Sequence, residues 1–353
     1  MKKLFKNKTI LITGASGSIG SNLVIKLLKH YQCKVIRAMS NDENGLHELL
    51  ENIDTNLKSF NLKSRMKKNN FRILYGDVRD YKRCISATKN VDIVIHAAAM
   101  KHVSICEYNP KETIKTNVYG TKNIIKASIK NKVKKFIFIS TDKAVNPTND
   151  MGSSKQKAEQ ISLTSNFLKN IGRTKISCVR FGNVIGSRGS VLPRFISQII
   201  SKQEIKVSSE KMSRYVMTIN DATRLIFKSL KMMKGGEIFI FKSMYSLKII
   251  DLAKCLKNYY QAFYKKIKIK IIGINVKEKF SEELMTTEEL KFSKEINDMY
   301  ILNYKNINKN TKKNQLSSSK LSSIDSKYGK FLTIEQILKL LIKNNLLKKL
   351  KLN

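Results

Sequence analysis

The most constraining feature of this sequence is a glycine-rich segment near the start of the chain, Gly14-Ala15-Ser16-Gly17-Ser18-Ile19-Gly20. An apolar run from Thr9 to Ile12 precedes it and predicts a β-strand, and a helical pattern from Ile19 to His30 follows it. Glycines at this position permit a tight turn and bring the backbone close to a pyrophosphate, which then lies at a helix N-terminus. A glycine loop can also simply join two elements, but this context favours dinucleotide binding. The candidate cofactor residues are Gly14, Ser16, Gly17, Ser18, Ile19 and Gly20.

Apolar runs alternate with helical patterns through the first half of the chain. Further strands are expected at Lys34–Met39, Phe71–Tyr75, Asp92–His96 and Phe136–Ser140, with a sixth along Ile176–Val184, and helices near Asp80–Thr88 and Glu112–Asn131. Strand–helix repetition predicts right-handed crossovers and a parallel sheet. Because such strands are buried on both faces, they are apolar without alternation. The predicted fold class is α/β, a doubly wound parallel sheet of the Rossmann type.

The second half of the chain has shorter, mixed elements. Helices are expected at Leu192–Lys202 and Leu247–Tyr260, a strand at Glu237–Phe241, and a half-exposed strand along the Lys/Ile alternation from Lys266. Residues 305–330 are polar and predict a linker, and Ile334–Leu350 has helical spacing. The predicted organisation is therefore a nucleotide-binding domain at 1–190, a smaller substrate-binding region at 191–300 interleaved with it, and a linker with a C-terminal helix at 301–353.

Composition narrows the class of protein further. The formal charge is +41, but lysines occur in almost every segment and only 11 residues are arginine. Spread charge is typical of a solvated surface and of drift toward AT-rich codons, whereas a polyanion partner is the alternative. Five cysteines lie far apart, which indicates reduced thiols and no zinc site. Without an apolar stretch long enough for a membrane span or a signal peptide, a cytoplasmic protein is expected.

Several motifs together resemble the extended short-chain dehydrogenase/reductase superfamily. They are the G-x-x-G-x-x-G spacing, Gly76-Asp77-Val78, His96-Ala97-Ala98-Ala99 and Thr116-Asn117-Val118. The resemblance implies that Asp77 and Val78 bind the adenine, that Ala97, Ala98 and Ala99 let the chain pass close to the cofactor, and that Asn117 belongs to the same site. His96 itself is interpreted as a packed ring on an apolar strand.

The sequence leaves the choice between NAD and NADP open. An acid at the end of the second strand would bind the ribose hydroxyls of NAD, and a small residue followed by arginine would accept the phosphate of NADP. Ser40 occupies the position of the acid, yet Asn41 follows it and no arginine is present. Ser40 is a candidate cofactor residue in either case.

A further set of motifs resembles the UDP-N-acetylglucosamine 4,6-dehydratases of polysaccharide biosynthesis. It comprises Ser140 to Asn149, Met100-Lys101-His102-Val103, Arg180 to Val191, Met212 to Thr218 and Glu282-Glu283-Leu284-Met285. The resemblance covers roughly residues 8–300 and implies a UDP-sugar substrate, and a homo-oligomer is expected. No metal site is expected because no two histidines lie at ligand spacing, and the spread charge does not favour a nucleic-acid partner. The implied substrate-binding residues are Lys101, His102, Asn183, Val184, Arg188 and Arg214.

This chemistry needs an acid and a base at adjacent carbons. Hydride leaves carbon 4 of the sugar, the resulting ketone acidifies the proton on carbon 5, the 6-hydroxyl departs with a proton, and hydride returns to carbon 6. By resemblance, Lys143 removes the carbon 5 proton and Asp142 protonates the leaving hydroxyl. A surface ion pair on a turn is the alternative reading of these two residues.

Two departures from the family patterns affect the expectations. The superfamily usually has Y-x-x-x-K, whereas this chain has Met151 four residues before Lys155, as a subgroup of the dehydratases does. The role of base for the 4-hydroxyl is therefore assigned to Thr141 with Asp142, and Lys155 is expected to hold the nicotinamide ribose. In addition, the arginine of the family's diphosphate motif is replaced by Asn275, which leaves Lys277 or Lys279 to supply charge.

Two other functions remain open. A UDP-sugar 4-epimerase shares the fold and the hydride removal, but it depends on the tyrosine that Met151 replaces. A non-catalytic cofactor-binding or polyanion-binding protein is the alternative from another class, motivated by Met151 and the net charge.

Overall fold

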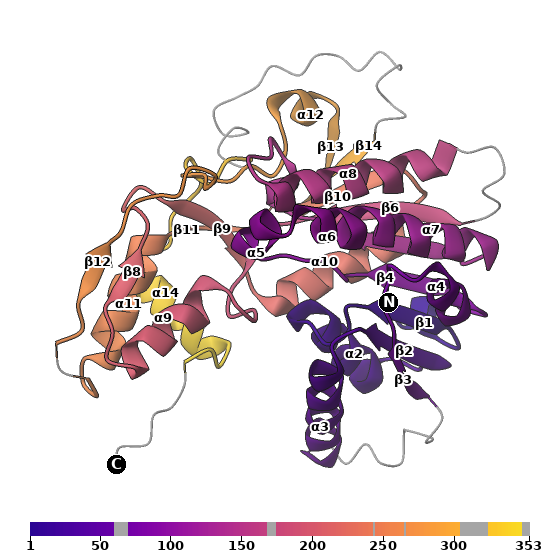
Figure 1. The fold of residues 1–353 in the computed structure, drawn as a ribbon, viewed down its shortest axis with the longest axis horizontal. Coiled ribbons are helices and arrows are strands. Elements are labelled where there is room, and N and C mark those ends of the chain that lie inside the picture. The colour runs from indigo at the N-terminus through magenta and orange to yellow at the C-terminus, as the bar shows by residue number, and fades with distance from the viewer. Residues whose placement is uncertain (60–69, 168–173, 243, 265, 304–323, 348–353) are drawn as a thin grey trace.

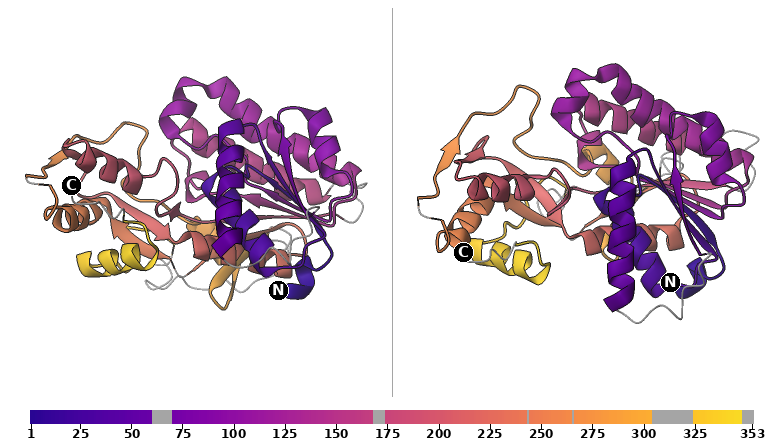
Figure 2. Two further views of the ribbon diagram at one scale, coloured as in Figure 1. Left: turned by 90° about the horizontal axis from the view of Figure 1, so that it is seen from below. Right: turned by 60° about the horizontal axis from the view of Figure 1, so that its bottom comes forward.

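The computed structural model describes residues 1–59, 70–167, 174–242, 244–264, 266–303 and 324–347. Within them the chain forms a larger lobe around a wide sheet and a smaller lobe that contains α9, α11 and α14 (Figure 1). Two further views keep the smaller lobe at one side of the sheet (Figure 2). None of the described helices is both long enough and apolar enough to cross a membrane.

The main sheet has nine strands in the order β13-β14-β10-β6-β5-β4-β1-β2-β3. From β3 to β10 the neighbours pair in parallel, and β14 and β13 add an antiparallel edge. This confirms the predicted doubly wound parallel sheet of the Rossmann type. The strands are β1 Thr9–Thr13, β2 Val35–Ser40, β3 Phe71–Tyr75, β4 Ile93–His96, β5 Lys135–Ile139, β6 Lys175–Arg180, β10 Glu237–Phe241, β13 Ser293–Ile296 and β14 Met299–Asn303.

Helices cover both faces of this sheet. On one face, Ile10 and Ile12 of β1 share an apolar core with α2 (Ser18–His30), α3 (Glu43–Ser59) and α10 (Ile219–Met232). On the other, Leu11 packs in a core with α4 (Tyr81–Thr88), α7 (Gly120–Lys130) and α8 (Asp150–Thr164). Successive side chains of a strand point to opposite faces, so a strand between two cores must be apolar throughout.

The smaller lobe is built from the segments that follow β6. Its elements are β7 Asn183–Val184, α9 Val191–Ile200, β8 Ile205–Val207, β9 Ser213–Met217, β11 Tyr245–Lys248, α11 Ile249–Tyr260, β12 Ile269–Ile271 and α14 Ile334–Lys343. One small sheet has the order β11-β9-β7 and the other pairs β12 with β8. A separate core joins α9, α11 and α14, with Ile337 and Leu341 of α14 fully buried. The strands β10, β13 and β14 also follow β6 along the chain, but they belong to the main sheet. The domain boundaries at 190 and 300 stay a prediction.

The helix predicted at Glu112–Asn131 is three segments in the structure. It runs as α6 (Pro110–Ile114), a π-helix (Lys115–Tyr119) and α7. A π-turn adds a residue to one helical turn and often marks a functional site. The spacing of apolar residues does not reveal this π-turn, because the helical spacing continues in α7 after it.

Other elements also differ from the sequence expectations. The Lys/Ile alternation forms a strand only at Ile269–Ile271, because β8 offers a partner of three residues. The C-terminal helix ends at Lys343 rather than Leu350, and residues 348–350 lie outside the described part. Most of the predicted linker at 305–330 also lies outside it. Among the elements without a counterpart in the prediction are the helices α3, α8 and α10 and the strands β9, β13 and β14.

Candidate active site

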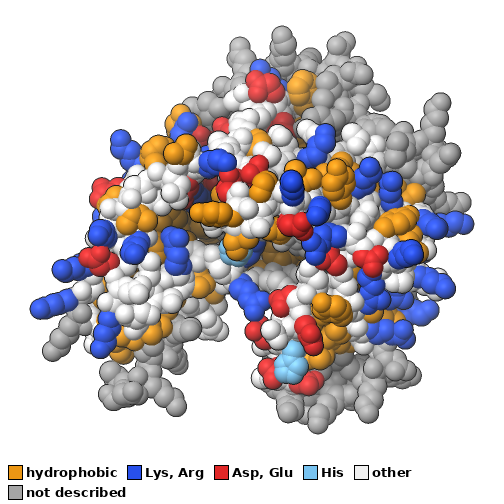
Figure 3. Space-filling view, viewed as in Figure 1, with side chains coloured by type: hydrophobic (Ala, Val, Ile, Leu, Met, Phe, Trp, Pro, Cys, Tyr) orange, Lys and Arg blue, Asp and Glu red, His pale blue; other side chains and the backbone are white. Residues whose placement is uncertain are grey.

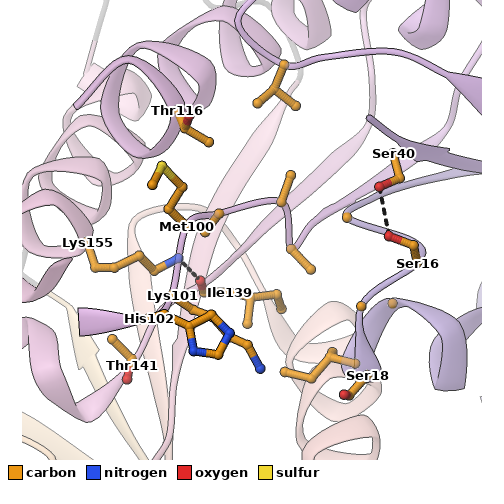
Figure 4. A pocket seen from close by; sticks show the side chains of 18 of the residues that line it. Ser16, Ser18, Ser40, Met100, Lys101, His102, Thr116, Ile139, Thr141 and Lys155 are labelled. Atoms are coloured by element: carbon orange, nitrogen blue, oxygen red, sulfur yellow. Dashed lines mark hydrogen bonds between the residues drawn. The ribbon is translucent and has the colours of Figure 1, made fainter. Parts of the chain in front are cut away.

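A cavity of about 860 Å³ lies at the carboxyl ends of the parallel strands. Ligands of doubly wound sheets bind at this edge. All predicted cofactor residues except Asn117 line the cavity, and so do Thr141, Lys143 and Met151. In the close view, Ser16 and Ser40 lie at one end of the cavity, and Lys155 and Thr141 lie at the other (Figure 4).

The glycine loop is shaped for a close approach of backbone to backbone. Gly14 has a φ of +65°, and a Cβ on it would lie 2.7 Å from the amide nitrogen of Ala98. A Cβ on Gly20 would lie 2.2 Å from the carbonyl oxygen of Gly14. The helix α2 begins at Ser18 with Gly17 as N-cap and no side-chain cap, so its first N–H groups are available to an anion. These residues fit the pyrophosphate of a dinucleotide.

The end of the cavity expected to hold adenosine contains hydroxyls and a paired carboxylate. The hydroxyl oxygens of Ser16 and Ser40 are 2.8 Å apart, and the amide of Asn41 donates to Asp77 Oδ2 at 3.1 Å. Arg79 donates to both oxygens of Asp77 from its backbone and side chain. Burial alone would raise the pKa of Asp77, but the hydrogen bonds and charge of Arg79 lower it below its usual value. Asp77 is therefore an acceptor at neutral pH.

Asn117 lies behind the cavity rather than in its wall. Its side chain accepts from the backbone N–H of Met100 at 2.8 Å and donates to the carbonyl oxygen of Met100 at 3.0 Å and to Ser154 Oγ at 2.9 Å. Asn117 belongs to the π-helix, and the neighbouring Thr116 lines the cavity instead. The amide thus holds the chain that follows Ala99. Direct binding of cofactor by Asn117 stays a prediction.

Asp142 and Lys143 form the charged centre of the site. They follow β5 in a single turn of 3-10 helix, with Thr141 as its N-cap. The amine of Lys143 lies 3.0 Å from Asp142 Oδ1, and the hydroxyl of Thr141 donates to the same oxygen at 2.9 Å. Asp142 is fully buried behind the cavity wall, and its Oδ2 has no hydrogen-bond partner. Asp142 therefore lies one layer behind the cavity lining, in contact with Thr141 and Lys143, which do line it.

Lys143 is a cation in this arrangement. Its amine also contacts Asn183 Oδ1 at 3.0 Å and Glu282 Oε1 at 3.4 Å. Burial alone would lower the pKa of Lys143, but the charges of Asp142 and Glu282 raise it above the usual lysine value, against the opposing charge of Arg214. Glu282, 3% exposed, was not among the predicted site residues. The only sequence signal for it is its place in the segment Glu282 to Met285.

Met151 and Lys155 lie one helical turn apart on α8 and both line the cavity. The thioether of Met151 has no exchangeable proton, so the position occupied by tyrosine in the superfamily has no base here. The amine of Lys155 donates to the carbonyl oxygen of Ile139 at 2.6 Å and lies 4.1 Å from the centre of the Phe138 ring. Burial lowers the pKa of Lys155 to about 8, with the charges of Cys178 and Glu159 opposing the shift.

The predicted substrate residues fall into two groups. Lys101, His102, Asn183 and Val184 line the cavity, and the ring of His102 points into it (Figure 4). Arg188 and Arg214 do not line it. Their roles in substrate binding stay predictions.

The two arginines are occupied by protein partners. Arg188 pairs with Asp42 at 3.3 Å and with Glu48 at 3.0 Å, on the surface beside α3. Arg214 donates to the carbonyl oxygens of Ser213, Lys279 and Phe280. The lysines of the altered diphosphate motif are also engaged: Lys277 pairs with Glu107, and Lys279 donates to the carbonyl oxygen of Val145 at 2.8 Å.

His96 is a neutral, fully buried ring in the structure. Its Nδ1 lies 2.6 Å from the hydroxyl of Thr13 and its Nε2 lies 2.9 Å from the hydroxyl of Thr121. Burial lowers its pKa to about 3, with a smaller contribution from Lys155. Among the described residues, no group of three or more His, Cys, Asp or Glu side chains is arranged to hold a metal ion. Lysine and arginine side chains are spread over the visible face of both lobes (Figure 3).

The fold and the glycine-lined cavity define a protein of the extended short-chain dehydrogenase/reductase type, with a cavity that fits a dinucleotide such as NAD or NADP. The dTDP-glucose 4,6-dehydratase DesIV of Streptomyces venezuelae, solved with NAD bound, has this fold. It aligns with a TM-score of 0.67 and 18% identity over 78% of this chain and 87% of its own. At the level of family, the chain belongs to the polysaccharide biosynthesis proteins, whose family model matches residues 10–304.

The following relatives with curated names match 84% or more of the chain. A protein of Methanocaldococcus jannaschii named as an uncharacterized membrane protein is 41% identical over 97% of both chains. The inverting UDP-N-acetylglucosamine 4,6-dehydratase of Campylobacter jejuni is 38% identical over 85% of this chain and 84% of its own. A UDP-glucose 4-epimerase of Rickettsia canadensis is 36% identical over 84% and 83%. Pen from Bacillus thuringiensis, a solved structure, aligns with a TM-score of 0.85 and 38% identity over 96% and 98%.

Proposed function

We propose that this chain is a nucleotide-sugar 4,6-dehydratase that converts UDP-N-acetylglucosamine to a UDP-4-keto-6-deoxy sugar in surface polysaccharide or glycan biosynthesis. The contact of Lys143 with Asp142 carries the proposal, because it sets an amine and a carboxyl 3.0 Å apart at the edge of the dinucleotide cavity. Dehydration needs both a base and an acid at neighbouring carbons. The similarity to a dehydratase of that name supports the substrate class.

The residues divide the proton transfers of this reaction among them. NAD or NADP, when bound, supplies the acceptor and later the donor of a transient hydride. Thr141 passes the proton of the sugar's 4-hydroxyl to Asp142, to which its own hydroxyl already donates. Lys143 removes the carbon 5 proton and later returns one there, and Asp142 protonates the departing 6-hydroxyl. Lys155, which lies beside Ile139 in the cavity wall, holds the nicotinamide ribose.

An experiment with purified protein tests this directly. Incubation with UDP-N-acetylglucosamine and NAD or NADP should give a product lighter by the mass of one water, read by mass spectrometry. Protein carrying Lys143→Met should give none under the same conditions. Absence of such a product from the unaltered protein with every UDP-hexosamine and hexose tried would overturn the proposal.

A UDP-sugar 4-epimerase is the second candidate, because relatives of similar identity bear that name. An epimerase returns the hydride to carbon 4 and has no use for an acid at carbon 6. Met151 lacks the proton-exchanging group on which epimerases of this fold depend. Formation of a carbon 4 isomer without loss of water would favour this candidate.

The setting of the enzyme is part of the same proposal. We expect a homo-oligomer in the cytoplasm, where nucleotide sugars are available, and no nucleic-acid partner despite the net charge of +41. Turnover without nucleic-acid binding at physiological salt would also separate this enzyme from a polyanion-binding scaffold.

A further inference from the structure

Lys143 is protonated in the structure, whereas the base that removes the carbon 5 proton must be a neutral amine. Its amine contacts two carboxylates, Asp142 at 3.0 Å and Glu282 at 3.4 Å, so it is held as an ammonium ion. An ammonium ion cannot remove a proton from carbon 5. Asp142 cannot relieve it, since in the proposed reaction Asp142 has just received the proton of the 4-hydroxyl. A further group beside Lys143 must therefore accept a proton.

We propose that Glu282 accepts the proton of Lys143, so that Lys143 can act as the base while Asp142 is protonated as the acid. In this step one N–H bond of Lys143 breaks and an O–H bond forms on Glu282 Oε1. An ammonium ion and a carboxylate become an amine and a carboxylic acid, and the net charge is unchanged. The proton returns to Lys143 once Lys143 has given the carbon 5 proton back to the product. The inference rests on the proposed dehydratase function.

The surroundings of Glu282 suit this exchange. Its side chain is 4% exposed, and its Oε2 has no hydrogen-bond partner. Because Oε2 makes no hydrogen bond, protonation of the carboxyl breaks none on that oxygen. Its backbone N–H donates to Ser326 Oγ at 2.9 Å, and its carbonyl oxygen accepts from the N–H of Ser326 at 3.0 Å. The backbone thus keeps the carboxyl in place whether or not it is charged.

Arg214 is the counter-ion of Glu282 and has a second partner. Arg214 Nε lies 3.8 Å from Glu282 Oε1, and its terminal nitrogen lies 3.8 Å from Glu278 Oε1. When Glu282 is neutral, Arg214 keeps Glu278 and the carbonyl oxygens that accept from it. Arg214 therefore stays paired when Glu282 is protonated. An unpaired buried cation would be costly.

Four described groups therefore face or surround the amine of Lys143. They are Asp142 on the turn after β5, Asn183 on β7, Glu282 on the segment before α12 (Thr287–Lys291), and Arg214 on β9 beyond Glu282. Three of the four, Glu282, Asn183 and Arg214, come from the segment after β12 and from the small sheet, so the proton state of Lys143 depends on how these pack against the main sheet.

Competitive labelling tests the contact without relying on any activity. Trace acetic anhydride labels only neutral amines, and mass spectrometry reports the labelling of Lys143 against an exposed lysine at each pH. In Glu282→Gln we expect the midpoint for Lys143 to fall by at least about one pH unit, since an opposite charge within ~4–6 Å shifts a pKa by ~1–3 units. Glu283→Gln is the matched control, because Glu283 bonds to Asn146 instead. An unchanged midpoint in Glu282→Gln would overturn the inference.

The pH dependence of turnover tests the proton transfer itself. Unaltered enzyme should turn over well below the pH at which its Lys143 labels, because Glu282 takes the proton inside the site. In Glu282→Gln the acid limb of kcat should coincide with the labelling midpoint of Lys143, whereas in Glu282→Asp, which keeps a carboxylate, the acid limb should still lie below that variant's own labelling midpoint. If turnover of the unaltered enzyme already follows its own labelling midpoint, Glu282 accepts no proton. If no dehydration occurs with any nucleotide sugar, the proposed function fails, and the labelling result still decides the contact.

Discussion

The amine of Lys155 lies 2.6 Å from the carbonyl oxygen of Ile139, at the end of β5 where the cavity begins. Lys155 is 7% exposed and has no carboxylate within ion-pair distance among the described residues. The fold therefore keeps an amine in an apolar wall at a cost to stability. Lys155 is predicted to hold the nicotinamide ribose, and that role would account for an amine that lowers stability.

We expect Lys155→Met to stabilise the protein at pH 7 while weakening cofactor binding. Burial lowers the pKa of Lys155 from 10.5 to about 8, which corresponds to a cost of about 3 kcal/mol in the charged form. Loss of the Ile139 hydrogen bond offsets about 1 kcal/mol of the gain. Because the folded-state pKa is depressed, the cost is fully present below pH 8 and is relieved as the pH rises from about 8 to 10.5.

Urea unfolding at pH 7 and pH 9.5 measures this effect. The stability advantage of Lys155→Met should shrink at the higher pH, and Lys157→Met, an exposed position on the same helix, should show no such trend. A variant destabilised equally at both pH values would contradict the expectation.

Asp142→Asn should bind cofactor and substrate but lose turnover by ~10²- to 10⁴-fold. The amide keeps the shape of the carboxyl, whereas it neither accepts the proton relayed by Thr141 nor delivers one to the 6-hydroxyl. Steady-state kinetics and a binding titration measure the two properties separately. Near-normal turnover in this variant would mean that the acid is another residue or water.

Lys143→Met should leave buried negative charge uncompensated. Asp142 is fully buried and loses its cation, so we expect a loss of about 1–3 kcal/mol in the free energy of unfolding. The double variant Lys143→Met, Asp142→Asn should recover most of that loss, because the one carboxylate that still lacks Lys143, Glu282, keeps Arg214 as its counter-ion. Chemical denaturation of the single and double variants checks this, and additive losses would contradict it.

Met151→Leu should retain turnover to within a few fold. Both side chains are apolar and similar in volume, and Met151 is 4% exposed, so the exchange costs less than about 1.5 kcal/mol. Met151→Tyr is the informative companion, because a tyrosine should not be needed for activity. Steady-state turnover rates of the unaltered protein, Met151→Leu and Met151→Tyr test this. A large increase in the rate of Met151→Tyr would favour epimerase-like chemistry.

Asn41→Arg should raise the affinity for NADP relative to NAD by about tenfold or more. Asn41 follows Ser40 in the wall of the cavity, where an arginine would face a ribose phosphate and form a charge-assisted pair. Isothermal titration with each dinucleotide measures the ratio, and Asn41→Gln is the control without charge. An unchanged ratio would mean that Asn41 does not face the adenosine ribose.

Local patterns in the sequence determined the parallel strands of the main sheet and most of the cofactor end of the cavity wall, but not the antiparallel edge strands β13 and β14. The structures of the glycine loop and of the apolar strands can be predicted from short stretches of sequence. A tight turn needs glycine, and a strand between two cores must be apolar on both faces. The resemblance to the dehydratases singled out Asp142, Lys143, Met151 and Lys155, which all follow β5 within a short span of chain, and their roles stay predictions.

Only the tertiary structure decided which distant groups meet the reactive amine. Glu282 lies 139 positions after Lys143 in the numbering, and Arg214 comes from a different sheet, so no periodicity relates them. The π-turn at Asn117 and the removal of Arg188 and Arg214 from the cavity wall have the same origin. The physical reason is that burial and charge act through space: the proton state of Lys143 depends on carboxylates that the fold, and not the local sequence, brings within 3.4 Å.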